Sequence, residues 1–318
     1  MTSDFDQLLY ILANEETELP LLRLSELSDL EGDEVVNFHN VWSSIPVERR
    51  RQIISELRTL ADENITLSFD VINRHAIQDD DSFVRKTAIQ NLWESEDPKL
   101  VPHFLAALKT DPDADVRGSA ASALGAFVLL GEMESLPTAL HAEIEDALLY
   151  AFRNEEHLSI RRFCLESLGF SSRDEVDPII LESYETQDSE LLQSSLLAMG
   201  RSADKQWQTH VLSHLFNPIP SIRREAVQAT GELELRAAIP DLIEILDDVD
   251  RSVRHAAIWS LSQLGGSRAM DALTSIIDFQ DDEEEIQLLE DALDNLAFVN
   301  ETRDFLIFDF DEPEDTNS

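Results

Sequence analysis

The amino-acid sequence predicts an all-α protein built as a right-handed α-solenoid of stacked antiparallel helix pairs. A ten-residue pattern with helical spacing recurs along the chain, and each copy follows another amphipathic segment. The 318 residues include only nine glycines and three tyrosines, which disfavours a fold of strands and tight turns. The length also exceeds that of one ordinary hydrophobic core, so the chain either divides into domains or repeats a small unit.

The repeated pattern begins with an aliphatic residue, usually followed by Arg, and has a small residue four places after its start. Leu-Gly or a substitute follows at places eight and nine. The copies begin at Val84, Val116, Ile160, Leu191, Ile222 and Val253, at intervals of 32, 44, 31, 31 and 31 residues, and a weaker seventh begins at Leu288. Two helices of about 11 residues and two turns fill such a period, so each copy is predicted to be the second helix of a pair.

Small residues inside the pattern predict that neighbouring second helices pack closely. These residues are Ala88, Ala120, Cys164, Ser195, Ala226, Ala257 and Ala292. The thiol of Cys164 is therefore expected to be buried and unreactive. Glycines at or near the predicted ends of the second helices are expected to close them in a left-handed conformation. They are Gly125, Gly169, Gly200, Gly231 and Gly265.

The recurring VRxxAxxxLG motif resembles HEAT repeats, in the short form known from phycobilisome lyase subunits and many bacterial proteins. The resemblance extends over about residues 62–300. It implies a HEAT/armadillo-like superhelix, and such repeats serve as scaffolds far more often than as catalysts. We therefore expect a protein that is not an enzyme and that needs no cofactor.

Three segments are predicted on this basis. Residues 1–61 are expected to form degenerate N-terminal helical repeats that cap the stack, and residues 62–300 to form the HEAT-repeat solenoid. Residues 301–318 are expected to be an acidic C-terminal tail, partly disordered. The apolar tail residues Phe305, Leu306, Phe308 and Phe310 could dock on the last repeat or on a partner, and both alternatives stay open.

The charge of the chain argues against several classes of partner. Lys and Arg number 24 against 65 Asp and Glu, which gives a net charge of −41 that would repel nucleic acid and an anionic membrane surface. No stretch approaches 18 consecutive apolar residues, so no membrane span is expected. With one cysteine and no signal-peptide pattern, a cytoplasmic protein is predicted. Its oligomeric state is left open, with a monomer favoured.

Two columns of charged residues are predicted to form a structural ladder. The resemblance implies that an Asp and Arg set ties adjacent turns together, because a guanidinium can bridge carbonyls and a carboxylate at once. The ladder residues are Arg85, Arg117, Arg161, Arg223 and Arg254, with Asp81, Asp113, Asp188 and Asp250 three places before four of the motif copies. His157 and Ile219 interrupt this Asp column. Leu192 interrupts the Arg column, so the ladder is expected to be discontinuous there.

A second set of residues is predicted to bind a partner protein or peptide along the concave face, which second helices line in this architecture. The set combines a partly basic column with large apolar side chains at positions that usually tolerate polar ones. Its members are Lys86, Arg162, Phe163, Leu197, Arg224, His255 and Trp259. The basic column could hold an acidic peptide or be neutralised by acidic turns, and the apolar residues could instead fill space between helices. Trp93, in the Gly place of its copy, is expected to be core.

Catalytic and metal motifs are weak throughout the sequence. His210 and His214 share a helix face, but Val211 stands where a zinc protease has Glu. Asp111, Asp113 and Asp115 alternate like a calcium loop without its Gly or closing Glu, so turns and caps are the better interpretation.

A non-catalytic protein-binding scaffold is therefore the predicted function, with the partner's identity unknown. A lyase-like or chaperone subunit resembling phycobilin lyase components is the alternative. A DNA glycosylase of the HEAT-like kind is disfavoured by the charge.

Overall fold

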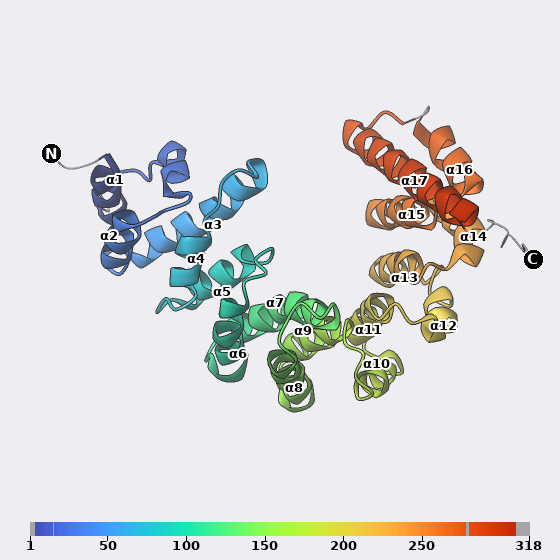
Figure 1. Ribbon diagram of the computed structural model, residues 1–318, viewed down its shortest axis with the longest axis horizontal. Coiled ribbons are helices and arrows are strands. Elements are labelled where there is room, and N and C mark those ends of the chain that lie inside the picture. Colours follow the sequence, from blue (N-terminus) through green and yellow to red (C-terminus); the bar gives the residue numbers. More distant parts are fainter. Residues whose placement is uncertain (1–3, 15, 278–279, 310–318) are drawn as a thin grey trace, which may run out of the picture. The chain divides into compact units, whose positions relative to one another are not determined.

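The computed structural model describes residues 4–14, 16–277 and 280–309, and of residues 301–309 it describes the backbone alone (Figure 1). Across these residues the chain forms helices and no strand, which confirms the predicted all-α class. The chain divides into two compact units, Met1–Leu168 and Gly169–Ser318. None of the described helices is both long and apolar enough to span a membrane.

The first unit stacks helix pairs in two layers. Its second helices pack on one another, α3 on α5, α5 on α7 and α7 on α9, while α4, α6 and α8 cover α5, α7 and α9 (Figure 1). Its helices are α1 (Asp4–Ala13), α2 (Asp33–Trp42), α3 (Val47–Glu63), α4 (Asp70–Ala76), α5 (Ser82–Asn91), α6 (Val101–Thr110), α7 (Ala114–Glu132), α8 (Thr138–Asn154) and α9 (Leu158–Leu168), with 3-10 turns at Leu21–Leu27 and Pro98–Leu100.

The second unit repeats the same arrangement. Its second helices α11, α13, α15 and α17 stack in sequence, and α10, α12, α14 and α16 each pack on the following second helix. Its helices are α10 (Val176–Tyr184), α11 (Ser189–Arg201), α12 (Gln208–Leu212), α13 (Pro220–Glu232), α14 (Ile239–Ile245), α15 (Arg251–Leu264), α16 (Ser267–Ile277) and α17 (Glu283–Asp309), with 3-10 turns at Lys205–Trp207 and Arg236–Ala238. Helix α17 extends beyond residue 300, where the C-terminal tail was predicted to begin. Residues 310–318 of that tail, including Phe310, lie outside the described residues.

The small residues of the repeated pattern form the seam between second helices, as predicted. Ala88, Ala120, Ala226 and Ala257 are fully buried, and so are Cys164 and Ser195. Small side chains here let the second helices approach closely without forcing neighbouring rotamers. The seventh copy is different, because Asp282 caps α17 through the amides of Glu284 and Glu285. This cap puts the fully buried Leu289, rather than Ala292, at the seam.

The glycines do not play the part predicted for most of them. Of the five glycines predicted to close a helix, only Gly265 has a left-handed backbone, with φ of 67° at the end of α15. Gly125 lies inside α7 and Gly231 inside α13, where an added Cβ would come within 2.8 Å of a serine Oγ on the next second helix. They are needed for close helix packing, and the left-handed residues that follow α7, α11 and α13 are Glu134, Ala203 and Glu234.

Cys164 should resist thiol reagents while the protein is folded. The side chain is fully buried in α9, and burial raises the pKa of its thiol far above the usual range. We expect an aromatic disulfide reagent to leave the native protein unmodified at pH 8 and to modify one thiol per chain in denaturant. Rapid labelling of the native protein would contradict this burial.

Candidate functional site

Arg85 shows how the arginine ladder is built. Its Nε and Nη2 each donate to the carboxylate of Asp111 in the next repeat, at 2.8 Å, and its Nη1 donates to the carbonyl oxygens of Asp79 and Asp80 at 2.8 and 3.0 Å. One planar guanidinium therefore holds the turn before its own helix and the turn of the following repeat.

The other ladder arginines repeat this geometry where a carboxylate is present. Arg117 donates from Nε and Nη2 to Glu155 at 2.9 and 3.2 Å, and these hydrogen bonds lower the pKa of the Glu155 carboxyl. Arg223 bonds both oxygens of Asp248 at 2.8 Å, and Arg254 bonds both oxygens of Glu285 at 3.2 and 3.3 Å. The ladder carboxylates Asp111, Glu155 and Asp248 stand five places before a motif, two places before the predicted Asp column.

The predicted Asp column caps helices instead. Asp113 accepts from the amides of Asp115 and Val116, and Asp81, Asp188 and Asp250 cap α5, α11 and α15 in the same way. Each side chain satisfies amides that the first helical turn leaves free. Asp81 has a second role, because Arg51 of the preceding repeat donates to both of its oxygens at 3.0 and 2.6 Å.

The ladder changes at the fourth copy, where a break was predicted. Leu192 has no guanidinium, and the facing ladder position holds Asn217 rather than an acid. A neutral network occupies this junction: Asn217 Nδ2 lies 3.0 Å from Nδ1 of His214, whose Nε2 lies 3.1 Å from the hydroxyl of Tyr184. Burial lowers the pKa of His214, which favours the neutral form of the ring. In the third copy Arg161 donates to the carbonyl of Phe152 at 3.1 Å and lies over its ring.

One rung was missed by the sequence analysis. Arg50 donates to the buried carboxylate of Asp79, which also accepts from the indole of Trp42 at 2.6 Å. Arg50 stands four places after Pro46, the cap of α3, as Arg85 stands four places after Asp81. The four-residue spacing can be found in the sequence. It is hard to recognise there, because Arg50 is one of three consecutive arginines and the capping residue is Pro rather than Asp.

The basic column of the predicted partner site is largely neutralised by neighbouring acids. Lys86 bonds Asp115 at 2.9 Å, Arg162 lies 3.9 Å from Glu166, and Arg224 bonds Glu225 at 2.5 Å. Nε2 of His255 accepts from Nε of Arg251 at 3.2 Å. These contacts favour the alternative in which the column stabilises the repeats rather than holding an acidic peptide.

The aromatic residues of the predicted partner site lie on glycines. Phe163 lies over Gly118, and a Cβ added to that glycine would come within 3.1 Å of the phenyl ring. Trp259 lies over Gly231, and a Cβ added there would come within 2.9 Å of the indole. Both side chains remain 37% exposed, whereas Leu197 is partly buried. Phe163 belongs to the first unit and Trp259 to the second, so each is a separate candidate contact.

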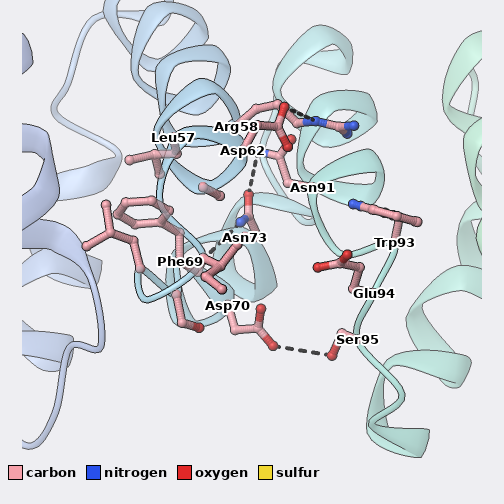
Figure 2. A pocket seen from close by; sticks show the side chains of 14 residues that line it. Leu57, Arg58, Asp62, Phe69, Asp70, Asn73, Asn91, Trp93, Glu94 and Ser95 are labelled. Carbon is pink, nitrogen blue, oxygen red and sulfur yellow. Dashed lines mark hydrogen bonds and ion pairs between the residues drawn. The ribbon is translucent and has the colours of Figure 1, made fainter. Parts of the chain in front are cut away.

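A cleft of about 490 Å³ opens in the first unit between α3, α4 and α5 (Figure 2). Trp93 lines it and is 59% exposed, so the prediction that Trp93 is core was wrong. The repeated sequence pattern does not show that Trp93 is exposed. The exposure arises because α3 continues past the end of α5 and leaves the indole beside an open space rather than between helices.

Two asparagines form the polar interior of this cleft. Asn91 Nδ2 donates to the carbonyl of Ile54 at 3.0 Å and to Oδ1 of Asn73 at 3.1 Å, and Asn73 in turn donates to the carbonyl of Phe69 (Figure 2). These bonds fix the orientation of both amides. Oδ1 of Asn91 is buried and has no donor among the described residues.

Two histidine sites bear on metal binding. Both ring nitrogens of His214 are engaged with Tyr184 and Asn217, so the metal interpretation of the His210 and His214 pair gains no support. In the described residues, one other group brings ligand atoms together, with Glu132, His141 and Glu145 within 4.8 Å of one another. Nε2 of His141 lies 3.8 and 3.6 Å from the two carboxylates, which is ion-pair geometry for a protonated ring.

Comparison with known families settles the nature of the repeat. A family model described as HEAT repeats matches residues 47–125 and 209–294, together more than half of the chain. The chain belongs to the HEAT-repeat family. The match begins three residues before Arg50, so the missed rung lies inside the recognised HEAT repeats. The predicted boundaries at residues 61 and 300 stay predictions.

Several solved HEAT-repeat and related structures are similar to this HEAT-repeat protein. The complex of CpcE and CpcF of phycocyanin lyase from Nostoc sp. PCC7120 matches at 17% identity and a TM-score of 0.49, covering 71% of this chain and 94% of that chain. YibA of E. coli matches at 13% identity and 0.42, covering 92% and 95%. A crystal structure of importin beta matches at 13% and 0.46, covering 92% and 46%. At these identities the similarity concerns the fold alone. No curated protein sequence matches the chain.

Proposed function

We propose that this HEAT-repeat protein is a non-catalytic scaffold that binds a partner protein or peptide on its second-helix layer. The observation that supports the proposal most directly is Trp259, an indole held against Gly231 with 37% of its surface open to solvent. An aromatic side chain fixed before binding loses little conformational freedom on binding, and such residues dominate interface energies.

The proposal includes no catalytic step. The thiol of Cys164, a potential nucleophile, is buried with a raised pKa. Lys86 and Arg224 of the second-helix layer are paired with carboxylates, so the binding energy would come from apolar contact at Trp259 and from the overall charge of −41, which favours a basic partner. We also propose a cytoplasmic location, because a single buried cysteine suits a reducing compartment.

Trp259→Ala should weaken partner capture by more than tenfold, as expected for an aromatic contact worth about 2 kcal/mol. The measurement is affinity capture from host lysate followed by titration of the recovered protein against purified wild type and variant. Phe216→Ala is the matched control, because Phe216 is 56% exposed in the same unit and belongs to the loop before α13.

Thermal unfolding of each variant separates binding from folding. A partner recovered equally by wild type and Trp259→Ala would contradict the proposed contact, and a co-purifying pigment would favour a lyase-like role. Trp259→Phe keeps an aromatic ring on Gly231 and should retain most of the affinity.

A further inference from the structure

The cleft around Trp93 exists because two successive second helices differ in length. Pro46 and Asp81 cap α3 and α5 at equivalent places, but α3 has 17 residues and α5 has 10. At 1.5 Å per residue, α3 therefore projects about 10 Å beyond the end of α5. The residues that follow α5 line a recess beside this overhang, and Figure 2 shows Trp93 and Glu94 across it from Leu57 and Phe69.

The aromatic wall of the cleft is unusual for this protein. Trp93 occupies the place at which four other copies have glycine, and those glycines allow the next second helix to come close. Trp93 is 59% exposed, and Ile65, which also lines the cleft, is 96% exposed. Apolar side chains this open to water indicate a surface that gains free energy when an apolar or planar group covers it.

The rim of the cleft is acidic. Asp62, Asp70 and Glu94 line it together with one cation, Arg58. Arg58 lies 3.4 Å from Asp62, and Asp70 lies 3.5 Å from Arg74 while accepting from Ser95 at 3.2 Å. Glu94 is exposed beside the indole. On a chain of net charge −41, this rim attracts a cation and repels an anion.

We propose that this cleft binds an arginine side chain carried by a basic segment of a partner protein. A guanidinium can lie over the face of Trp93 and donate two parallel hydrogen bonds to a carboxylate of the rim. The apolar stem of the arginine would cover the exposed Ile65. The cleft belongs to the first unit and Trp259 to the second, so the site goes beyond the proposed scaffold contact and stands independently of it.

The test titrates the full-length protein by calorimetry with the tripeptide acetyl-Gly-Arg-Gly-amide and with the same peptide containing citrulline, its neutral isostere. The arginine peptide should bind with a dissociation constant on the order of 1 mM or below, and citrulline should reduce the affinity at least tenfold. Trp93→Ala should weaken binding of the arginine peptide by about 3- to 30-fold, because an exposed to half-buried cation–π contact has that value. Glu94→Gln should weaken it by a smaller factor, and more so at low salt.

Two further variants keep the result interpretable. Trp93→Phe should retain part of the affinity, and Tyr10→Ala removes a 71% exposed aromatic residue outside the cleft in the same unit and should leave the affinity unchanged. Equal affinities for arginine and citrulline, unchanged binding by a folded Trp93→Ala variant, or no saturable binding at about 10 mM peptide would each overturn the proposal. Trp259→Ala should bind the arginine peptide normally, so failure of one proposal leaves the other intact.

Discussion

Arg223→Ala should lower the free energy of unfolding by about 3 kcal/mol, because it leaves a nearly buried carboxylate and two carbonyl groups without their donor. The guanidinium bonds both oxygens of Asp248 at 2.8 Å and the carbonyls of Asn217 and Pro218 at 2.7 and 3.3 Å. Its side chain is 11% exposed and that of Asp248 12%. Urea denaturation followed by circular dichroism measures the loss.

Three comparison variants test the geometry behind this value. Arg223→Lys keeps the charge but cannot form the paired hydrogen bonds, so it should lower the free energy of unfolding by about half as much as Arg223→Ala does. Arg236→Ala removes an exposed arginine of the same unit and should change stability by less than about 0.5 kcal/mol. Arg161→Ala should lower the free energy of unfolding by only about 1 kcal/mol, because Arg161 donates to one carbonyl and lies over one ring, both of Phe152, and among the described residues bonds no carboxylate in the next repeat. Equal losses for Arg223→Ala and Arg236→Ala would contradict the ladder.

Gly169→Ala should destabilise the second unit by about 2 to 3 kcal/mol. An added Cβ would lie 2.7 Å from Cα and 3.0 Å from the carbonyl oxygen of Ala198. Both are backbone atoms of α11, so no side-chain rotation can relieve the contact and the helix itself must shift. Thermal unfolding of the variant measures the effect.

Ala203→Gly is the informative counterpart, since it changes the same pair of residue types in the opposite direction. Ala203 has φ of 52° in an exposed turn, where a Cβ is unfavourable and glycine is not. We expect this variant to be as stable as the wild type or up to about 1 kcal/mol more stable. Destabilisation by Ala203→Gly and none by Gly169→Ala would mean that close packing is not the role of the glycines.

The repeat architecture could be predicted because its signals are local. The small seam residues, the Asp caps and the apolar spacing all lie within one helix and its first turn. The carboxylate ends of the ladder were less evident, although Asp79, Asp111 and Asp248 stand in register five places before a motif. The resemblance drew attention to the capping column instead.

The candidate sites could be predicted less well, because they depend on where helices end in space. Trp93 occupies a glycine place, and whether that place is covered depends on the length of α3 and on the loop that follows it. Phe163 and Trp259 were identified from their size at polar positions, and the structure adds that each lies on a glycine. Pairing of Lys86 and Arg224 involves acids on neighbouring turns, which spacing alone does not locate.

The arginine ladder has a consequence for how such a chain can lengthen. The repeat of α14 and α15 carries both halves of the link, with Asp248 accepting from the previous repeat and Arg254 donating to the next. A duplicated copy of this segment would present the same acceptor and the same donor at its two ends, so its neighbours would need no compensating substitutions. The junction of Leu192 and Asn217 has neither half of the link, so a duplication inserted there would need other contacts to hold it to its neighbours.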